Sequence, residues 1–203
     1  MADVIIKADI IAKVNKRLLT NFATDGTDLD DEINSVLVDM NNRGLLVGND
    51  PGQTLVDGSL TLNYPTGFRH AIAITLTEAN GTPLRPLRKL PGGHAEYRKL
   101  RHDNLATGFT EWYSEFEGKI YLWRPASQAY TTLIEFRKNH AKDPNNIEFT
   151  TDFENLMSAG ATFWHAANIG RTTGIAIWGP IYQNELRWAM LNRKTQPSII
   201  GNA

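Results

Sequence analysis

The stretch that most constrains the fold is residues 111–137, EWYSEFEGKIYLWRPASQAYTTLIEFR, where aromatic and β-branched side chains alternate over short runs. Such runs favour β-strands over helices. Turn-forming residues divide the stretch at Glu117-Gly118 and again at Arg124-Pro125-Ala126. The sequence therefore predicts three short consecutive strands.

The side-chain pattern also predicts how these strands are buried. The middle strand is apolar on both faces, which is typical of a strand covered on both sides, with Ile120 and Leu122 on one face and Tyr121 and Trp123 on the other. The preceding strand alternates between an apolar and a wet face, with Trp112 and Phe116 inside and Glu111, Tyr113, Glu115 and Glu117 outside. Both patterns indicate a structural sheet.

Helical periodicity marks the two ends of the chain. Two helices are expected first, over 3–20 and from a cap at Thr27 or Asp28 to Gly44. Two more are expected last, from a cap at Thr151 or Asp152 to Gly170 and over 180–194. The pattern predicts an α+β fold in which N- and C-terminal helices form a helical bundle with an inserted small antiparallel β-sheet or sandwich.

The apolar spacing within these helices predicts the core. In the second helix the expected stripe is Ile33, Val36, Leu37 and Met40. In the last helix we expect Ile181, Leu186, Ala189 and Met190 to pack, with Tyr182 and Trp188 partly exposed.

Changes of pattern along the chain predict four segments. These are an N-terminal helical hairpin over 1–44, a β-rich insertion over 45–145, C-terminal helices over 146–194 and an extended tail over 195–203. Within the insertion, Asp57-Gly58 predicts a hairpin turn, 70–77 a strand and 94–102 a short helix.

The composition indicates the cellular compartment in which the protein folds. The 203 residues include no cysteine, which excludes disulfides and thiolate chemistry and suits a reducing cytoplasm. The N-terminus lacks the pattern of a signal peptide, and no apolar run approaches the roughly 20 residues that cross a bilayer. We expect a soluble protein without a membrane partner.

Charge is distributed unevenly along the chain. Residues 1–60 carry five basic and ten acidic side chains, for a net charge of −5, whereas residues 84–102 carry +5. The basic segment is compatible with a nucleic-acid patch, with complementary surfaces between copies, or with an ordinary solvated face. Under the second interpretation the subunit-interface candidates are Arg85, Arg88, Lys89, Arg98, Asp28, Asp31 and Glu32.

Signatures of catalysis are absent from the sequence. There is no phosphate-binding loop, dinucleotide fingerprint or nucleophile elbow, and the five histidines lack metal-ligand spacing. The carboxylates Glu111, Glu115 and Glu117 fall on one face of one strand, which favours a solvated face over an acid–base pair. We expect no catalytic residue, cofactor or metal, and a protein that is not an enzyme.

A second interpretation concerns the aromatic residues. Side chains that stack on sugars would suit a carbohydrate- or receptor-binding module, and the candidates are Trp112, Tyr113, Tyr121, Trp123 and Tyr130. Because Tyr121 and Trp123 lie in the strand that is apolar on both faces, burial in the core is favoured.

Four stretches together resemble the head-tail adaptor, or connector, proteins of tailed bacteriophages. They are LNYPTGFR at 62–69, TPLRPL at 82–87, AEY at 95–97, and the run from Trp112 through EGKIYLWRPA to Phe136. The framing helices fit as well, whereas residues 171–179 depart from the family pattern. In that family a helical bundle carries a β insertion, and the resemblance implies the same fold here.

The resemblance also implies a function and partners. The chain is expected to form a homo-oligomeric ring, usually twelvefold, in the neck of the virion between the portal protein and a tail or nozzle protein, after assembly in the host cytoplasm. Double-stranded DNA would pass through the lumen. In this family C-terminal segments commonly reach the portal, so Gln196, Pro197, Ile199 and Ile200 are candidates for a docking tail.

Overall fold

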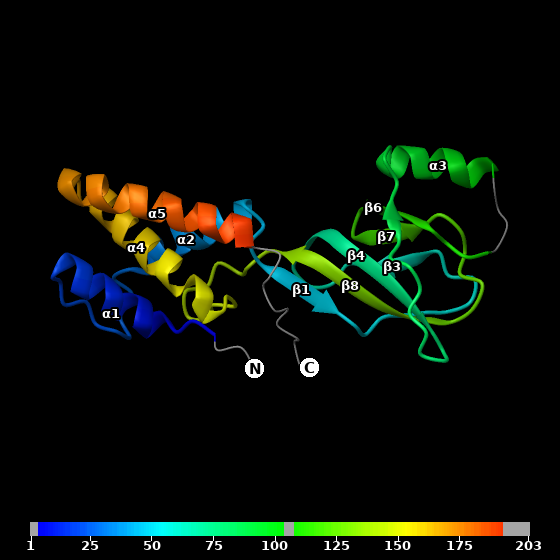
Figure 1. Ribbon diagram of the computed structural model, residues 1–203, viewed down its shortest axis with the longest axis horizontal. Helices are drawn as coiled ribbons and strands as arrows, with labels where there is room; N and C mark the ends of the chain where they lie inside the picture. Colours follow the sequence, from blue (N-terminus) through cyan, green and yellow to red (C-terminus); the bar gives the residue numbers. More distant parts are fainter. Residues whose placement is uncertain (1–3, 104–107, 193–203) are drawn as a thin grey trace. The chain divides into compact units, whose positions relative to one another are not determined.

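The computed structural model describes residues 4–103 and 108–192 (Figure 1). Within these ranges it contains five α-helices, one short 3-10 helix and two small sheets, so the predicted mixed α+β class is confirmed. The chain divides into two compact units. The helical unit comprises the described residues up to Val47 and from Asn139 onward, and the β unit comprises Gly48–Lys138. The predicted insertion runs somewhat wider, from 45 to 145.

The helical unit draws its elements from both ends of the sequence. They are α1 (Lys7–Leu18), α2 (Asp30–Asn42), the 3-10 helix η1 (Thr151–Phe153), α4 (Glu154–Asn168) and α5 (Thr172–Asn192). Helix α4 contacts α1, α2 and α5, so it organises the unit (Figure 1). The predicted stripe of α2 is confirmed, because all four of its apolar side chains are fully buried.

Small residues in α4 allow its neighbours to approach closely. A Cβ added at Gly160 would lie 2.5 Å from Cγ2 of Val36 and 2.7 Å from Cε2 of Tyr182. Carbon atoms that are not bonded do not come so close, so only glycine fits between α2 and α5 at this position.

The predicted helix caps are wrong. Helix α2 begins at Asp30 after Leu29, without a side-chain cap from Thr27 or Asp28, because the carbonyl of Thr27 accepts the N–H of Asp30. Before α4, the carbonyl of Thr150 likewise accepts the N–H of Phe153 and forms η1, where Thr151 or Asp152 was expected to cap. Backbone turns satisfy the free N–H groups that side chains were expected to cap.

Helix α5 is longer than predicted. It begins at Thr172, so the segment predicted to connect the last two helices forms its first turns, and Pro180 lies inside the helix. Proline lacks the N–H that would bond to the carbonyl of Ala176, but both residues are exposed and water can satisfy that carbonyl.

The side chains of α5 that pack also differ from those predicted. Tyr182, expected to be partly exposed, is fully buried, and its hydroxyl donates a hydrogen bond to Asp39 Oδ2 at 2.7 Å. Ile181 and Met190 are exposed, which contradicts the prediction, whereas the buried Leu186 and Ala189 and the exposed Trp188 agree with it.

The β unit contains two sheets. In the first, β8 (Tyr130–Lys138) pairs with β1 (Val47–Asp50), β2 (Thr54–Leu55) and β4 (Phe68–Glu78). In the second, the order is β3 (Thr61–Asn63), β7 (Lys119–Leu122), β6 (Trp112–Phe116) and β5 (Arg88–Lys89), with β5 parallel to β6. Helix α3 (Gly93–Asp103), close to the predicted short helix, contacts β6.

The two sheets share one hydrophobic core. Ile74, Leu76 and Ile134 enter it from the first sheet, and Ile120 and Leu122 enter it from the second. The predicted β6–β7 turn is confirmed: Glu117 and Gly118 both have positive φ, which a two-residue hairpin of the primed type requires. None of the helices in the described ranges is long and apolar enough to cross a bilayer.

Three details of the predicted β-structure are wrong. The third strand of the 111–137 stretch, β8, pairs with β4 in the first sheet, so the stretch supplies strands to both sheets. The Asp57-Gly58 turn does not join a hairpin, because β2 pairs with β8 and β3 pairs with β7.

The third error concerns β6. Tyr113 is buried in the core and Phe116 is exposed, the reverse of the expected facing. The second sheet is covered on both sides, by the first sheet and by α3, so an alternating wet face does not form.

Candidate functional site

The last helix exposes an unusual apolar surface. Besides Met190 (37%), which lies elsewhere around the helix, four large apolar side chains of α5 are exposed: Ile177 (53%), Ile181 (38%), Trp188 (49%) and Leu191 (81%). With Asn184 they follow one another at intervals of four, three, four and three residues. We call these five residues the α5 exposed stripe. Their spacing is that of the seam along which helices pack in coiled coils.

This stripe is separate from the side of α5 that packs in the core. The buried residues of α5 are Gly174, Tyr182, Leu186 and Ala189, which lie roughly a third of a turn away around the helix at about 100° per residue. The helix therefore has one apolar face inside the unit and a second apolar face outside. Contiguous exposed apolar surface of this kind is typical of protein-interaction sites.

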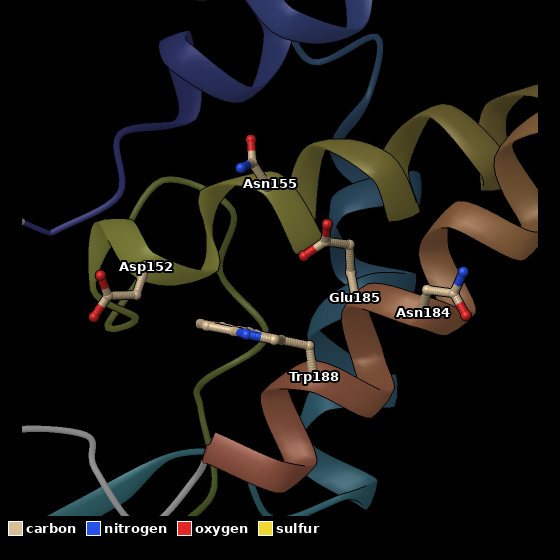
Figure 2. A pocket seen from close by; sticks show the side chains of 5 residues that line it. All are labelled: Asp152, Asn155, Asn184, Glu185 and Trp188. Carbon is tan, nitrogen blue, oxygen red and sulfur yellow. The ribbon is translucent and has the colours of Figure 1, made fainter.

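A pocket of about 380 Å³ lies at the C-terminal part of the stripe. We call it the Trp188 pocket. Figure 2 shows its lining, in which three side chains project from α5 and two come from η1 and the first turn of α4: Asn184, Glu185 and Trp188, and Asp152 and Asn155. The indole of Trp188 extends toward Asp152.

Two of the polar groups at the pocket differ in how they are engaged. Asn155 points toward α1, where its Oδ1 accepts a hydrogen bond from Lys13 Nζ at 3.3 Å, and Lys13 also pairs with Glu154 at 2.9 Å. Asp152 makes no hydrogen bond or ion pair with another residue of the described chain. Its carboxylate is available to a binding partner.

Glu185 lies near the positive charge of Arg17. Burial lowers the pKa of the Arg17 guanidinium, while the negative charges of Glu185 and Glu154 raise it. Arg17 is stacked over the ring of Trp178 at 4.8 Å, and the described residues show no salt bridge between it and Glu185. Glu185 thus keeps hydrogen-bonding capacity, and the pocket as a whole remains acidic.

The chemistry of the Trp188 pocket favours a cationic or a sugar ligand. The face of an indole attracts cations through its quadrupole, and nearby carboxylates add direct Coulombic attraction. An exposed tryptophan beside carboxylates and amides also suits the stacking and hydrogen bonding of a sugar ring. Among the described residues, no group of three histidine, aspartate or glutamate side chains could hold a metal ion.

The predicted basic residues all lie on the β unit and are exposed. Two of them have partners in their own chain. Arg88 stacks over Trp112 at 5.8 Å, and Lys89 Nζ pairs with Glu115 Oε2 at 2.6 Å. Arg85 and Arg98 make no hydrogen bond or ion pair with other described residues.

The predicted acidic residues also include both exposed residues and one with partners in its own chain. Asp28 and Asp31 are exposed, as an interface would need. Glu32 is only 6% exposed and its Oε1 lies 3.2 Å from His165 Nδ1 and accepts a hydrogen bond from Asn168 Nδ2 at 3.1 Å. Glu32 therefore joins α2 to α4 within one chain, and its inclusion in a subunit interface is wrong.

The carboxylates of the β unit are not equivalent, contrary to the single solvated face that was expected. Glu111 and Glu117 are exposed, but Glu115 lies under Lys89 and accepts a hydrogen bond from the backbone N–H of Ala71 at 2.9 Å. Glu115 thus links the second sheet to β4 of the first. It has a structural role.

The predicted sugar platform is not assembled. Tyr113 and Tyr130 are buried, Trp112 is covered by Arg88, and Trp123 has Arg124 over its ring at 4.5 Å. Tyr121 instead joins a cluster with His94 of α3, whose ring stacks on Phe116 at 4.2 Å between ring centres.

The candidates for a docking tail, Gln196, Pro197, Ile199 and Ile200, lie outside the described residues. Comparison with protein-family models and with curated proteins finds no match to this chain.

Sequence reasoning found one member of the pocket and missed the rest. Trp188 was expected to be partly exposed, and it is. Asp152 was interpreted as a helix cap, and Asn155, Asn184 and Glu185 carried no signal, because they come together only when α4 packs on α5. The 4-3-4-3 spacing of α5 was visible in the sequence, but the predicted start at Pro180 removed its first member, Ile177.

Proposed function

We propose that the chain is a non-enzymatic structural protein of a tailed-phage virion, a head-tail adaptor. It forms a homo-oligomeric ring, usually of twelve copies, in the neck between the portal protein and a tail or nozzle protein. Double-stranded DNA passes through the ring, which is assembled in the host cytoplasm. The helical unit and the inserted β unit would correspond to the bundle and β insertion of that family.

The α5 exposed stripe is the observation that supports this proposal most. A chain that works alone gains nothing by leaving Ile177, Trp188 and Leu191 in water, whereas a subunit buries them against its neighbour. The coiled-coil spacing means that another helix could pack along the whole stripe. We take the occupant to be a second copy of this chain.

The distribution of charge supports a ring in particular. A head-to-tail ring needs two different and complementary surfaces on each subunit. The Trp188 pocket is acidic, and the exposed segment with Arg85 and Arg98 is basic. Opposite charges on separate surfaces favour this heterologous contact and disfavour the pairing of identical surfaces.

Assembly is tested by mixing the purified chain with its cognate portal protein and measuring the mass of the complex by light scattering after size-exclusion chromatography. We expect a complex that contains one ring of the chain for each portal. The double variant Ile177→Ser/Leu191→Ser removes apolar surface without touching the core, so it should fold normally and bind less. Portal that stays bare at saturating concentrations of the folded wild-type chain would reject the proposal.

A carbohydrate- or receptor-binding tail module is the second candidate. It is favoured by the exposed indole of Trp188 beside Asp152 and Asn184. Titration with a panel of host-surface glycans, followed by tryptophan fluorescence, distinguishes the two functions. Saturable glycan binding that Trp188→Ala abolishes, without assembly on portal, would favour the module.

A further inference from the structure

We infer that the Trp188 pocket binds an arginine from the basic segment of a second copy, either Arg85 or Arg98. This inference rests on the proposed function, because it names the contact that would join neighbouring subunits. It assigns a role to Trp188 and Asp152, two lining residues that the sequence resemblance does not single out.

Most tryptophan rings of the chain already have an arginine stacked on them. Three of the five have an arginine over the ring, in the pairs Arg17–Trp178 at 4.8 Å, Arg88–Trp112 at 5.8 Å and Arg124–Trp123 at 4.5 Å. A fourth, Trp164, packs against the helical core. Trp188 is half exposed, and no arginine among the described residues stacks on it. Its open face is the position that an arginine would fill.

The rest of the pocket suits a guanidinium group. The carboxylate of Asp152 has no partner among the described residues, and the indole of Trp188 extends toward it (Figure 2). A guanidinium is planar, so it can stack on an indole while its N–H groups donate to a carboxylate at the ring edge. An ammonium group lacks that planar face, so arginine fits this pocket better than lysine.

The basic segment supplies arginines that are free to bind. Arg88 and Lys89 are engaged with Trp112 and Glu115, but Arg85 and Arg98 are exposed without a hydrogen-bonding or ionic partner in the described chain. An arginine of this segment would form an ion pair with the unpaired carboxylate of Asp152 and stack on the open face of Trp188. Each copy carries both surfaces, so the contact repeats from copy to copy as a head-to-tail ring requires.

Disulfide trapping tests the contact directly, because the chain has no cysteine of its own. One chain carries Asn184→Cys at the edge of the pocket. The other carries Pro86→Cys beside Arg85, or Ala95→Cys one helical turn before Arg98, so both arginines are kept. Equal amounts of the two full-length chains are mixed under mild oxidation, and cross-linked heterodimer is measured on a non-reducing gel.

We expect at least one of these cysteines to give about tenfold more heterodimer than Lys119→Cys, an exposed control position on β7, because tenfold corresponds to about 1.4 kcal/mol of contact energy. Adding Arg85→Glu/Arg98→Glu to the same cysteine chain should return the yield to the control level. Adding Trp188→Ala to the pocket chain should do the same.

Yields equal to the Lys119→Cys control at both positions would overturn the inference. So would heterodimer that is insensitive to both the glutamate and the Trp188→Ala changes. If trapping fails while the wild-type chain still assembles on portal, the pocket contact is wrong and the adaptor proposal stands. If trapping succeeds while portal stays bare, the copies associate through the pocket and the adaptor proposal fails.

Discussion

The two units of the chain carry opposite kinds of free surface. In the helical unit α5 exposes an apolar stripe that ends at an acidic pocket. In the β unit several aromatic and charged groups are engaged internally, as Glu115 is with Lys89 and His94 with Phe116, whereas Arg85 and Arg98 are exposed without a partner among the described residues. The proposed contact between copies uses this difference, because each chain holds both the acidic pocket and the unpaired arginines. Because the two halves differ, association of many copies can continue from one to the next.

The largest expected effect contrasts two aromatic residues on the same helix. Tyr182 is buried and bonded to Asp39, so Tyr182→Ala should lower the free energy of unfolding by about 3–5 kcal/mol. Trp188→Ala should change it by less than about 0.5 kcal/mol, because an exposed side chain contributes little to folding. Urea denaturation followed by far-UV circular dichroism measures both. Equal losses would mean that Trp188 belongs to the core.

The next prediction concerns the close approach of helices at α4. Gly160→Ala should destabilise the helical unit by about 1–3 kcal/mol, because the new methyl group collides with Val36 and Tyr182. The better helix propensity of alanine offsets at most about 1 kcal/mol of this loss. Gly179→Ala is the matched control, since its Cβ would meet Phe163 at an ordinary 3.5 Å. A stabilised Gly160→Ala variant would show that the helices pack less closely.

Alkaline pH should weaken the β unit through Tyr113. Burial, and secondly the charge of Glu115, raise the pKa of Tyr113 from 10 to about 12. The folded state therefore holds this proton more tightly than the unfolded state, and the resulting stability is complete below pH 10 and lost as the pH rises toward 12. The loss should reach roughly 2–3 kcal/mol.

Denaturation at a series of pH values, compared between the wild type and Tyr113→Phe, isolates this contribution. The phenylalanine variant should lose less stability over the same range. In the helical unit, burial and the hydrogen bond to Asp39 also raise the pKa of Tyr182, so some alkaline loss remains in the variant. Identical pH profiles would contradict the assignment to Tyr113.

The smallest effect is expected from the carboxylates of β6 and its turn. Glu115→Gln should cost about 1 kcal/mol, because it weakens the ion pair with Lys89 at a site that is mostly buried. Glu117→Gln, an exposed change in the same hairpin, should have no measurable effect. Thermal unfolding of the two variants compares them. If Glu117→Gln had as large an effect as Glu115→Gln, the two carboxylates would be equivalent, as the sequence predicted for a single solvated face.

Local patterns predicted much of the fold and little of the candidate site. The stripe of α2 and the turn at Glu117-Gly118 follow from spacing and turn chemistry, and both are confirmed. The pairing of β8 with β4 and the burial of Tyr113 depend on contacts between distant segments, which periodicity does not report. Periodicity could not predict the Trp188 pocket either, because the pocket forms where η1 and α4 meet α5.

One local rule also misled the prediction of α5. The helix was expected to start at Pro180, and proline does commonly occupy the first turn of a helix. Inside α5 the proline lies on an exposed side, where the loss of one backbone hydrogen bond is tolerated. The predicted start was therefore eight residues too late.

The most direct test of the central claim is an electron-microscopy structure of the chain assembled on its cognate portal. The proposal predicts a closed ring in which the α5 exposed stripe of each copy is buried against the next copy and Trp188 faces Arg85 or Arg98 of that neighbour. A ring in which Ile177, Trp188 and Leu191 all face solvent, or a portal that carries no ring, would contradict it.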